Sequence, residues 1–185
     1  MDSEVRALLQ KFQDGYASRD LAKLDAFMDL FIAGDELEVI GTGAVKPPKG
    51  EWCQGREAVR RLVASDWQFW GNVSFDVGGA NIFVKGDVGW LATTGTVTDT
   101  IPVEQRYNDY LKYVGGVLVD EERDEQAKTL EIVALGNDIM KALSLSETVV
   151  CPFRFTAVAV KEQGTWRFHQ MQFSFATTRV PDVRL

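Results

Sequence analysis

Histidine is the scarcest chemically useful residue in this chain of 185 residues, with one copy at position 169. A single histidine excludes a metal site built from several imidazoles, and any Ser-His-Asp or Cys-His arrangement would have to use His169. The sequence therefore predicts no metal site, and no cofactor is predicted either. We expect His169 itself to be structural or to lie at an interface.

Cysteine and positive charge are also in short supply. The two cysteines, Cys53 and Cys151, lack metal-type spacing, so free thiols are the first interpretation and a disulfide between them is the alternative. Lysine and arginine number 20 against 27 acidic residues, which gives a net charge of −7. This balance argues against binding of nucleic acid or of an anionic membrane through bulk electrostatics.

Long apolar runs are absent. No stretch approaches the length that crosses a bilayer, and the acidic start Met1-Asp2-Ser3-Glu4 lacks the apolar core of an export signal. A cytoplasmic location is therefore predicted. With 45% hydrophobic and 25% charged residues, the chain has the composition of an ordinary globular protein, long enough to bury a sizeable core in one domain.

Helical periodicity dominates the first third of the chain, and a period of two dominates the remainder apart from the segment 101–149. Apolar residues recur at helical spacing over 4–17, about 20–33 and 56–67. Alternating patterns then predict strands, with glycine-containing hairpin signals between them, over 73–77, 80–84, 88–98, 153–161 and 165–175. Helices followed by antiparallel strands predict an α+β fold, in which helices cover one face of a curved sheet.

The last strand, 165–175, has two different faces if a period of two holds throughout. The face that grades from aromatic to polar consists of Trp166, Phe168, Gln170, Gln172 and Ser174. Such a face is typical of a sheet that forms the floor of a partly polar pocket. The bulkier face consists of Arg167, His169, Met171, Phe173 and Phe175, and it is expected to pack on something else.

The segment 101–149 is longer than a connection between neighbouring strands requires. A first helix is expected to open at Pro102 and to end at Gly115-Gly116, and a second is expected over about 121–145. Three interpretations stay open: a lid that reaches inward with Tyr107, Tyr110 and Tyr113, an extra packing layer, or a dimer contact.

Several short motifs, taken in order, resemble the SnoaL-like group of the NTF2-like superfamily. They are Tyr16-Ala17-Ser18-Arg19-Asp20-Leu21, Ile40-Gly41-Thr42-Gly43, Trp52-Cys53-Gln54-Gly55-Arg56-Glu57-Ala58-Val59, Gly86-Asp87-Val88-Gly89-Trp90-Leu91-Ala92, Phe155-Thr156-Ala157-Val158-Ala159-Val160, Gly164-Thr165-Trp166-Arg167-Phe168 and Phe173-Ser174. The resemblance covers about 1–99 and 150–178. It implies one domain over 1–185, a cone in which N-terminal helices pack on a strongly bent, mostly antiparallel sheet, with a helical insertion at about 101–149 before the last two strands.

The resemblance does not select a function, because such proteins include isomerases, cyclases, dehydratases, pocketed proteins without known chemistry and dimerisation modules. Relatives often carry histidines in the last strand, where this chain has Gln170 and Gln172. Glutamine forms hydrogen bonds but does not titrate near neutral pH, so proton transfer by those positions is in doubt.

Candidate catalytic residues are carboxylates that could project into an apolar cavity, where desolvation raises a pKa towards neutrality. Asp66 is the first, because Trp67 and Trp70 flank it at the end of a predicted helix. Asp99, at the end of a predicted strand, is the second. An aspartate at such a position is more often a helix cap or an exposed charge, and this is the alternative for both.

Binding without chemistry is the leading expectation, with a small, largely apolar molecule in the cone and an acid–base enzyme as the alternative. The predicted pocket residues are Tyr16, Trp52, Trp67, Trp70, Trp90, Arg154, Thr156, Gln170 and Gln172. The tryptophans could instead be plain core packing.

An assembly module is the second alternative. The resemblance implies a homodimer through the outer face of the sheet, and the residues expected on that face are His169, Met171, Phe173 and Phe175.

Overall fold

The computed structural model describes residues 2–44, 46–47, 50–100, 102–121, 123–143 and 147–175. The chain forms two compact units, one made of residues 1–97 and 151–185 and the other of residues 98–150. The second unit nearly coincides with the predicted insertion. Each unit is described separately.

The helices of the first unit bury the apolar stripes that the sequence predicts. They are α1 (Asp2–Ser18), the short 3₁₀ turn η1 (Leu21–Lys23), α2 (Leu24–Met28) and α3 (Arg56–Phe69). The helix expected over 20–33 is shorter than predicted and begins as η1, where Asp20 accepts a hydrogen bond from the backbone N–H of Ala22. No described helix is long and apolar enough to cross a membrane.

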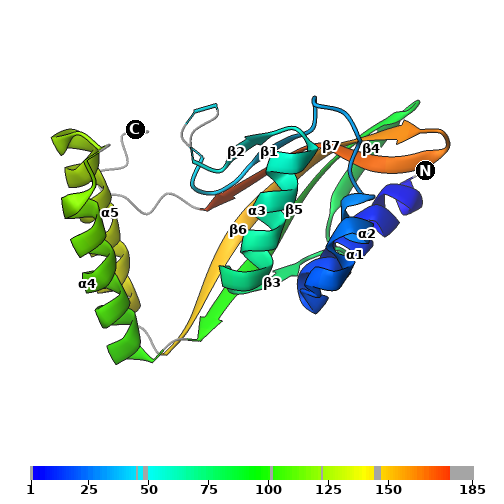
Figure 1. The fold of residues 1–185 in the computed structure, drawn as a ribbon. Helices are drawn as coiled ribbons and strands as arrows, with labels where there is room; N and C mark the ends of the chain where they lie inside the picture. The colour runs from blue at the N-terminus through cyan, green and yellow to red at the C-terminus, as the bar shows by residue number, and fades with distance from the viewer. Residues whose placement is uncertain are drawn as a thin grey trace, which may run out of the picture. The chain divides into compact units, whose positions relative to one another are not determined.

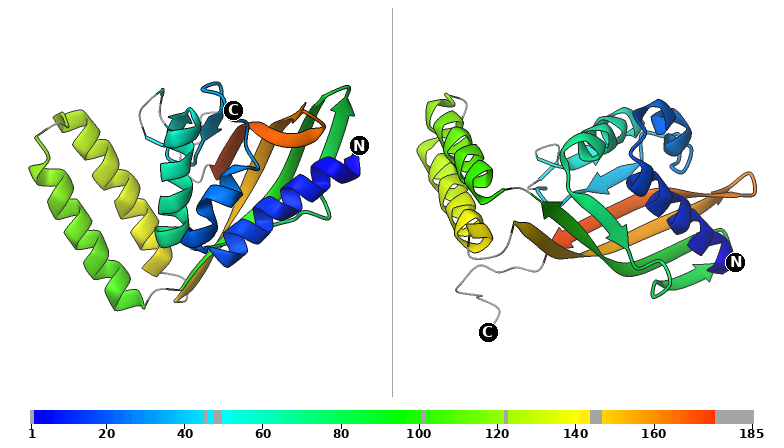
Figure 2. Two further views of the ribbon diagram at one scale, coloured as in Figure 1. Left: turned by 45° about the vertical axis from the view of Figure 1, so that its right-hand side comes forward. Right: turned by 90° about the horizontal axis from the view of Figure 1, so that it is seen from below.

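The sheet lies behind these helices (Figure 1). Its strands are β1 (Glu38–Ile40), β2 (Trp52–Gln54), β3 (Asn72–Phe75), β4 (Asn81–Lys85), β5 (Val88–Thr100), β6 (Thr148–Glu162) and β7 (Thr165–Phe175). The strand order is β2-β1-β7-β6-β5-β3, and β4 pairs with β5. β1 runs parallel to β7, whereas β6 and β7 are antiparallel. Figure 2 shows all three helices on the same face of the curved sheet, as the α+β prediction requires.

An aromatic cluster fills the space between the helices and the sheet. The ring of Phe12 on α1 lies 5.4 Å from that of Phe75 on β3, 5.8 Å from that of Phe155 on β6 and 5.3 Å from that of Phe168 on β7. All four side chains are buried. Offset and edge-to-face pairs of this kind add about 0.5–1.5 kcal/mol each beyond their buried area. The helices are thus fixed on the sheet by interlocking rings.

A β-bulge at His169 overturns the predicted faces of the last strand. Val158 pairs with Gln170 and Ala159 pairs with Phe168, so His169 has no partner on β6. The extra residue shifts the alternation by one. Trp166, Phe168, Met171 and Phe173 are therefore all buried on the helix side, and Gln170 and Gln172 lie on the outer face.

The predicted dimer face is wrong for this reason. Met171 and Phe173 belong to the core and are not available on the outer face, while His169 is half-buried and Phe175 is exposed at the strand end. The bulky residues of β7 follow the spacing two, three, two, and the step of three is the sequence signal of the bulge.

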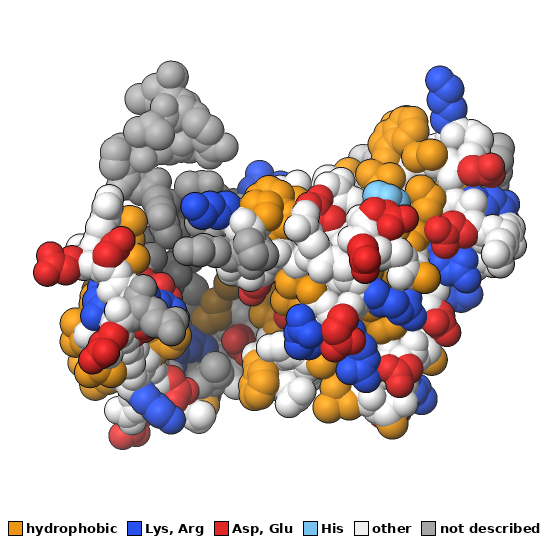
Figure 3. Space-filling view, turned by 45° about the horizontal axis from the view of Figure 1, so that its top comes forward, with side chains coloured by type: hydrophobic (Ala, Val, Ile, Leu, Met, Phe, Trp, Pro, Cys, Tyr) orange, Lys and Arg blue, Asp and Glu red, His pale blue; other side chains and the backbone are white. Residues whose placement is uncertain are grey.

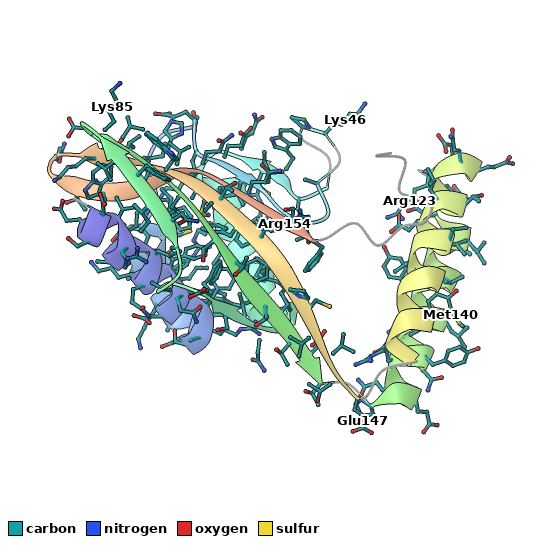
Figure 4. The ribbon with its side chains drawn as sticks, turned by 180° about the vertical axis from the view of Figure 1, so that it is seen from behind. Lys46, Lys85, Arg123, Met140, Glu147 and Arg154 are labelled. Atoms are coloured by element: carbon teal, nitrogen blue, oxygen red, sulfur yellow. The ribbon has the colours of Figure 1, made fainter. Side chains whose placement is uncertain are left out.

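The second unit is a helical hairpin of α4 (Val103–Val119) and α5 (Glu125–Leu143). Gly115 and Gly116 do not end the first helix as predicted, and α4 continues to Val119. Val117 and Ile139 are buried in the hairpin, and the guanidinium of Arg123 in the connection pairs with Asp120 at 2.9 Å and with Glu131 at 2.5 Å. Figure 4 shows Arg123 at the connected end of the hairpin.

The bulge predicts opposite outcomes for two single-residue deletions in β7. Deleting His169 removes the unpaired residue and leaves Phe168, Met171 and Phe173 facing the core, so we expect a folded protein. Deleting Gln172 turns Phe173 outward, and we expect a loss of about 3–5 kcal/mol, as for truncation of a buried phenylalanine. Urea unfolding followed by tryptophan fluorescence measures both. Equal destabilisation by the two deletions would contradict the assigned facing.

Candidate functional site

A carboxyl–phenol pair joins α1 to α3. The hydroxyl of Tyr16, near the end of α1, donates a hydrogen bond of 2.8 Å to Oδ2 of Asp66, in the last turn of α3. Tyr16 is 2% exposed, whereas Asp66 is half-buried. The described residues provide no hydrogen-bond donor to Oδ1, the second oxygen of Asp66. The pair therefore combines an anchored oxygen with one that no described residue occupies.

Burial dominates the electrostatics of this pair. It raises the pKa of Asp66 from 3.8 to about 7, the hydrogen bond from Tyr16 opposes this rise, and the nearby charge of Glu51 adds to it. Burial and the adjacent carboxylate also raise the pKa of Tyr16 well above 10.0. At neutral pH Asp66 is thus able both to accept and to donate a proton, while Tyr16 keeps its own.

Aromatic rings enclose the pair. The rings of Trp67 and Trp70 each lie 6.4 Å from that of Tyr16, edge-on. The buried indole nitrogen of Trp67 has no hydrogen-bond partner among the described residues. Of the predicted pocket residues, the structure brings Tyr16, Trp67 and Trp70 together with Asp66.

Two neighbours of Asp66, Cys53 and Glu51, were not predicted from the sequence. Cys53 pairs with Val39 across β1 and β2, and Val39 pairs with the buried Met171, so the thiol lies on the helix side of the sheet. Burial, with smaller contributions from the negative charges of Glu51 and Asp66, raises the pKa of this thiol. These contacts depend on strand register, which no local motif encodes. We name Tyr16, Glu51, Cys53, Asp66, Trp67 and Trp70 the inner cluster.

The remaining predicted pocket residues lie on the other side of the sheet. Trp90, Thr156, Gln170 and Gln172 line a groove of about 240 Å³ on the outer face, together with Phe83 and neighbouring strand residues. The rings of Phe83 and Trp90 are stacked 5.9 Å apart, and the two side chains are 58% and 46% exposed. The predicted pocket residues are therefore divided between the two faces of the sheet.

A hydrogen-bonded carboxylate lies next to this outer groove. Glu38 accepts hydrogen bonds from Nε1 of Trp52 at 2.8 Å and from Nε2 of Gln170 at 2.6 Å, and these bonds lower its pKa. The one histidine, half-buried, reaches the surface beside acidic side chains (Figure 3). Arg154 is exposed and donates a hydrogen bond of 2.6 Å to the backbone oxygen of Phe175 (Figure 4). It belongs neither to the inner cluster nor to the lining of the outer groove.

The candidates in the second unit are mostly exposed to solvent. Asp99 is exposed near the end of β5. Tyr107 and Tyr113 are also largely exposed, and the phenol of Tyr113 donates to Glu131 within the hairpin.

Comparison with known proteins shows the family. The SnoaL-like domain family matches residues 5–126, about two thirds of the chain, and the protein belongs to it. The family match extends through α4, further than the segment that the motifs cover. No curated protein matches.

Solved structures of the NTF2-like superfamily share the fold. A provisional dehydratase from Streptomyces avermitilis is 12% identical, with 94% of this chain and 95% of that chain covered and a TM-score of 0.59. An NTF2-like protein of unknown function from Pseudomonas putida is 12% identical. The match covers 97% of this chain and 89% of that chain, with a TM-score of 0.56. An NTF2-like protein with a cystatin-like fold from Novosphingobium aromaticivorans is also 12% identical. The match covers 96% of this chain and 83% of that chain, with a TM-score of 0.54. At this identity the likeness shows the fold alone.

The raised pKa of Asp66 predicts a pH-dependent difference in stability between the wild type and Asp66→Asn. Between pH 3.8 and about 7 the folded protein holds a proton that the unfolded chain has released, so the free energy of unfolding falls as pH rises through this window. Asparagine has no such titration. Urea titrations of both proteins across this range measure their free energies of unfolding. The difference between the two free energies should change with pH inside the window and level off outside it.

Tyr16→Phe serves as the companion variant. It removes the hydrogen bond that favours the charged carboxylate, so the pKa of Asp66 should rise further, as ¹³C NMR of the labelled carboxyl can measure. A flat difference curve for Asp66→Asn, or an Asp66 pKa that falls in Tyr16→Phe, would contradict the assigned electrostatics.

Proposed function

We propose that this protein binds a small, largely apolar molecule beside the inner cluster and acts on it by proton transfer, as an isomerase, cyclase or dehydratase. The observation that carries the proposal is the carboxyl of Asp66, whose pKa is raised to about 7 and whose Oδ2 accepts the hydrogen bond from Tyr16. General acid–base catalysis works best when the pKa of the group lies near the working pH.

The roles of the side chains follow from their contacts. Asp66 would take a proton from the bound molecule and return it at a second position or to a leaving group, because its two protonation states are about equally populated at neutral pH. Tyr16 holds the carboxyl in one orientation and keeps its own proton. Trp67 and Trp70 offer flat apolar surfaces, which favour an apolar or aromatic substrate over a charged one.

The charges around Asp66 also favour a substrate without an acidic group. Glu51 is close enough to raise the pKa of Asp66, and a further anion would meet repulsion there. Arg19, the cation that acts on Asp66, donates to the backbone oxygens of Tyr16 and Gly71 and is thus committed to the fold.

Binding without chemistry is the second candidate. The stacked and exposed Phe83–Trp90 pair above Gln170 and Gln172 favours it, because this groove offers aromatic surface and amide groups but no residue with a raised pKa. The Streptomyces structure is described as a provisional dehydratase, a class of enzyme that moves protons, which agrees with the first candidate. The cytoplasmic location and the homodimer remain predictions.

A ligand screen followed by one substitution tests the proposed enzyme. Thermal shifts against aromatic, steroid-like and polyketide-like compounds should identify a ligand, since one present at 100 times its Kd adds about 2.7 kcal/mol of stability. Product formation from that ligand should fall by about 10²-fold or more in Asp66→Asn, the usual contribution of a general acid or base, while the ligand still binds. In the wild type the rate should change through about pH 7, as Asp66 titrates.

The matched control is Asp25→Asn, which removes an exposed carboxylate that pairs with Arg60 on the surface. It should leave turnover unchanged. A ligand whose thermal shift is lost in Trp90→Ala but kept in Trp67→Ala would place binding in the outer groove and refute the proposed site.

A further inference from the structure

A short loop after β1 holds the side chain of Glu51. Oε2 of this carboxylate accepts hydrogen bonds from the backbone N–H of Gly43 at 2.7 Å and from the hydroxyl of Thr42 at 3.4 Å. The backbone N–H of Gly41 donates to the carbonyl oxygen of Glu51 at 2.9 Å. We name Gly41, Thr42 and Gly43 the carboxylate holder. The proposed function does not yet explain why the chain builds it.

Glycine is required in this loop because Glu51 lies against the backbone. A Cβ on Gly41 would collide with Oε2 and with the Cβ of Glu51. Gly50, the residue before Glu51, has a φ of 70°, and a Cβ there would collide with the backbone oxygen of Gly43. Two positions thus lack a side chain so that one carboxylate can be held in place.

Strand pairing directs this carboxylate toward Asp66. The bond between Gly41 and Glu51 extends the pairing of β1 with β2 by one step, and Glu51 precedes Cys53 by two residues. Side chains two apart share one side of a strand, so Glu51 lies with Cys53 on the helix side of the sheet. Burial is the main cause of the raised pKa of Tyr16, Cys53 and Asp66, and the negative charge of Glu51 adds to each rise.

The cations that act on the inner cluster are bonded elsewhere. The guanidinium of Arg19 donates to two backbone oxygens. Arg61 acts on Cys53, but it pairs with Glu57 at 3.5 Å on the exposed side of α3. Neither Glu51 nor Asp66 forms an ion pair within the part of the chain that the structure describes. The negative charge therefore remains available to a bound molecule.

The hydrogen-bond donors of the cluster are also in use. The hydroxyl of Tyr16 donates to Asp66, and the donors of the carboxylate holder bond to Glu51. Nε1 of Trp67 has no partner among the described residues, but it is buried. An enolate or other anion formed beside Asp66 would thus be repelled by Glu51 and would lack free donors. A positive charge would be attracted both by Glu51 and by the faces of the indole rings.

We propose that the substrate is a neutral alcohol whose carbinol carbon is tertiary, allylic or benzylic, and that Glu51 stabilises the positive charge that develops on this carbon. The inference rests on the proposed function and names the substrate class of the same site. Protonated Asp66 gives its proton to the hydroxyl group, and the C–O bond breaks with its electron pair leaving on water. The Asp66 carboxylate then takes a proton from the neighbouring carbon, and the C–H electron pair forms the C=C bond. The net reaction is loss of water.

Two compounds of matched shape test the preference for positive charge. One is neutral para-tert-butylphenol, and the other is (para-hydroxyphenyl)trimethylammonium, which carries a fixed charge at the centre of the same bulky group. At about pH 5.5, where Asp66 is mostly protonated, the wild type should bind the cation about tenfold more tightly than the neutral compound. Isothermal titration calorimetry measures both Kd values. Glu51→Gln should remove most of this preference, because the amide oxygen can still accept both hydrogen bonds but carries no charge.

Glu162→Gln is the matched control. It makes the same substitution at the turn between β6 and β7, where Glu162 pairs with Arg167 at 3.6 Å, and it should keep the tenfold preference. A wild type that binds the cation no more tightly than the neutral compound would overturn the proposal. A preference that persists in Glu51→Gln, or one that Trp90→Ala abolishes, would overturn it as well.

Turnover distinguishes this inference from the proposed function. With the substrate that the thermal-shift screen identifies, Glu51→Gln should lower kcat by about tenfold or more on the acid plateau of the pH profile, with little change in KM. A higher kcat in Glu51→Gln would indicate an anionic transition state, and it would refute the cationic centre while leaving Asp66 as the proton carrier. Unchanged turnover in Asp66→Asn would instead refute the proposed function, and this inference with it.

Discussion

The packing of one ring, Phe12, fixes the geometry on which the first unit depends. This ring meets rings from α2, β3, β6 and β7, so it determines where α1 lies on the sheet. Tyr16 is one helical turn further along the same face, and its ring is tilted against that of Phe12 with the centroids 4.9 Å apart. The position of its hydroxyl, and hence of the carboxyl that it anchors, follows from the core. A site built in this way is rigid because its support is apolar packing and not a loop.

Two opposing effects determine the protonation state of Asp66. Desolvation favours the neutral acid, and the phenol hydrogen bond favours the anion. Desolvation is the larger effect, and the hydrogen bond limits the rise, so the pKa lies near neutrality. A carboxyl buried without this hydrogen bond would stay protonated at neutral pH and could not accept a proton, whereas a fully solvated one would stay ionised and would have no proton to donate. Asp66 is half-buried, and its Oδ1 receives no hydrogen bond from the described residues.

The sequence predicts the fold well because helical and strand periodicities are local, and the stripe of α1 and the glycine-marked hairpins need no tertiary information. It predicts Asp66 and Tyr16 separately, but their contact joins residues 50 positions apart and depends on how two helices cross. The facing of β7 fails for a different reason. A bulge changes the period at a single residue, so every position after His169 is assigned to the wrong side. Gly115 and Gly116 mislead because helix propensity is a weak prior that neighbouring residues override.

The division into two units leaves the inner cluster wholly within the first of them. A buried acid near neutrality costs stability, so its surroundings must be closely packed. Tyr16 and Trp67 meet this demand, because both are buried and their rings pack edge-to-face beside the carboxyl. The packing that fixes the helices on the sheet therefore also fixes the proton affinity of Asp66.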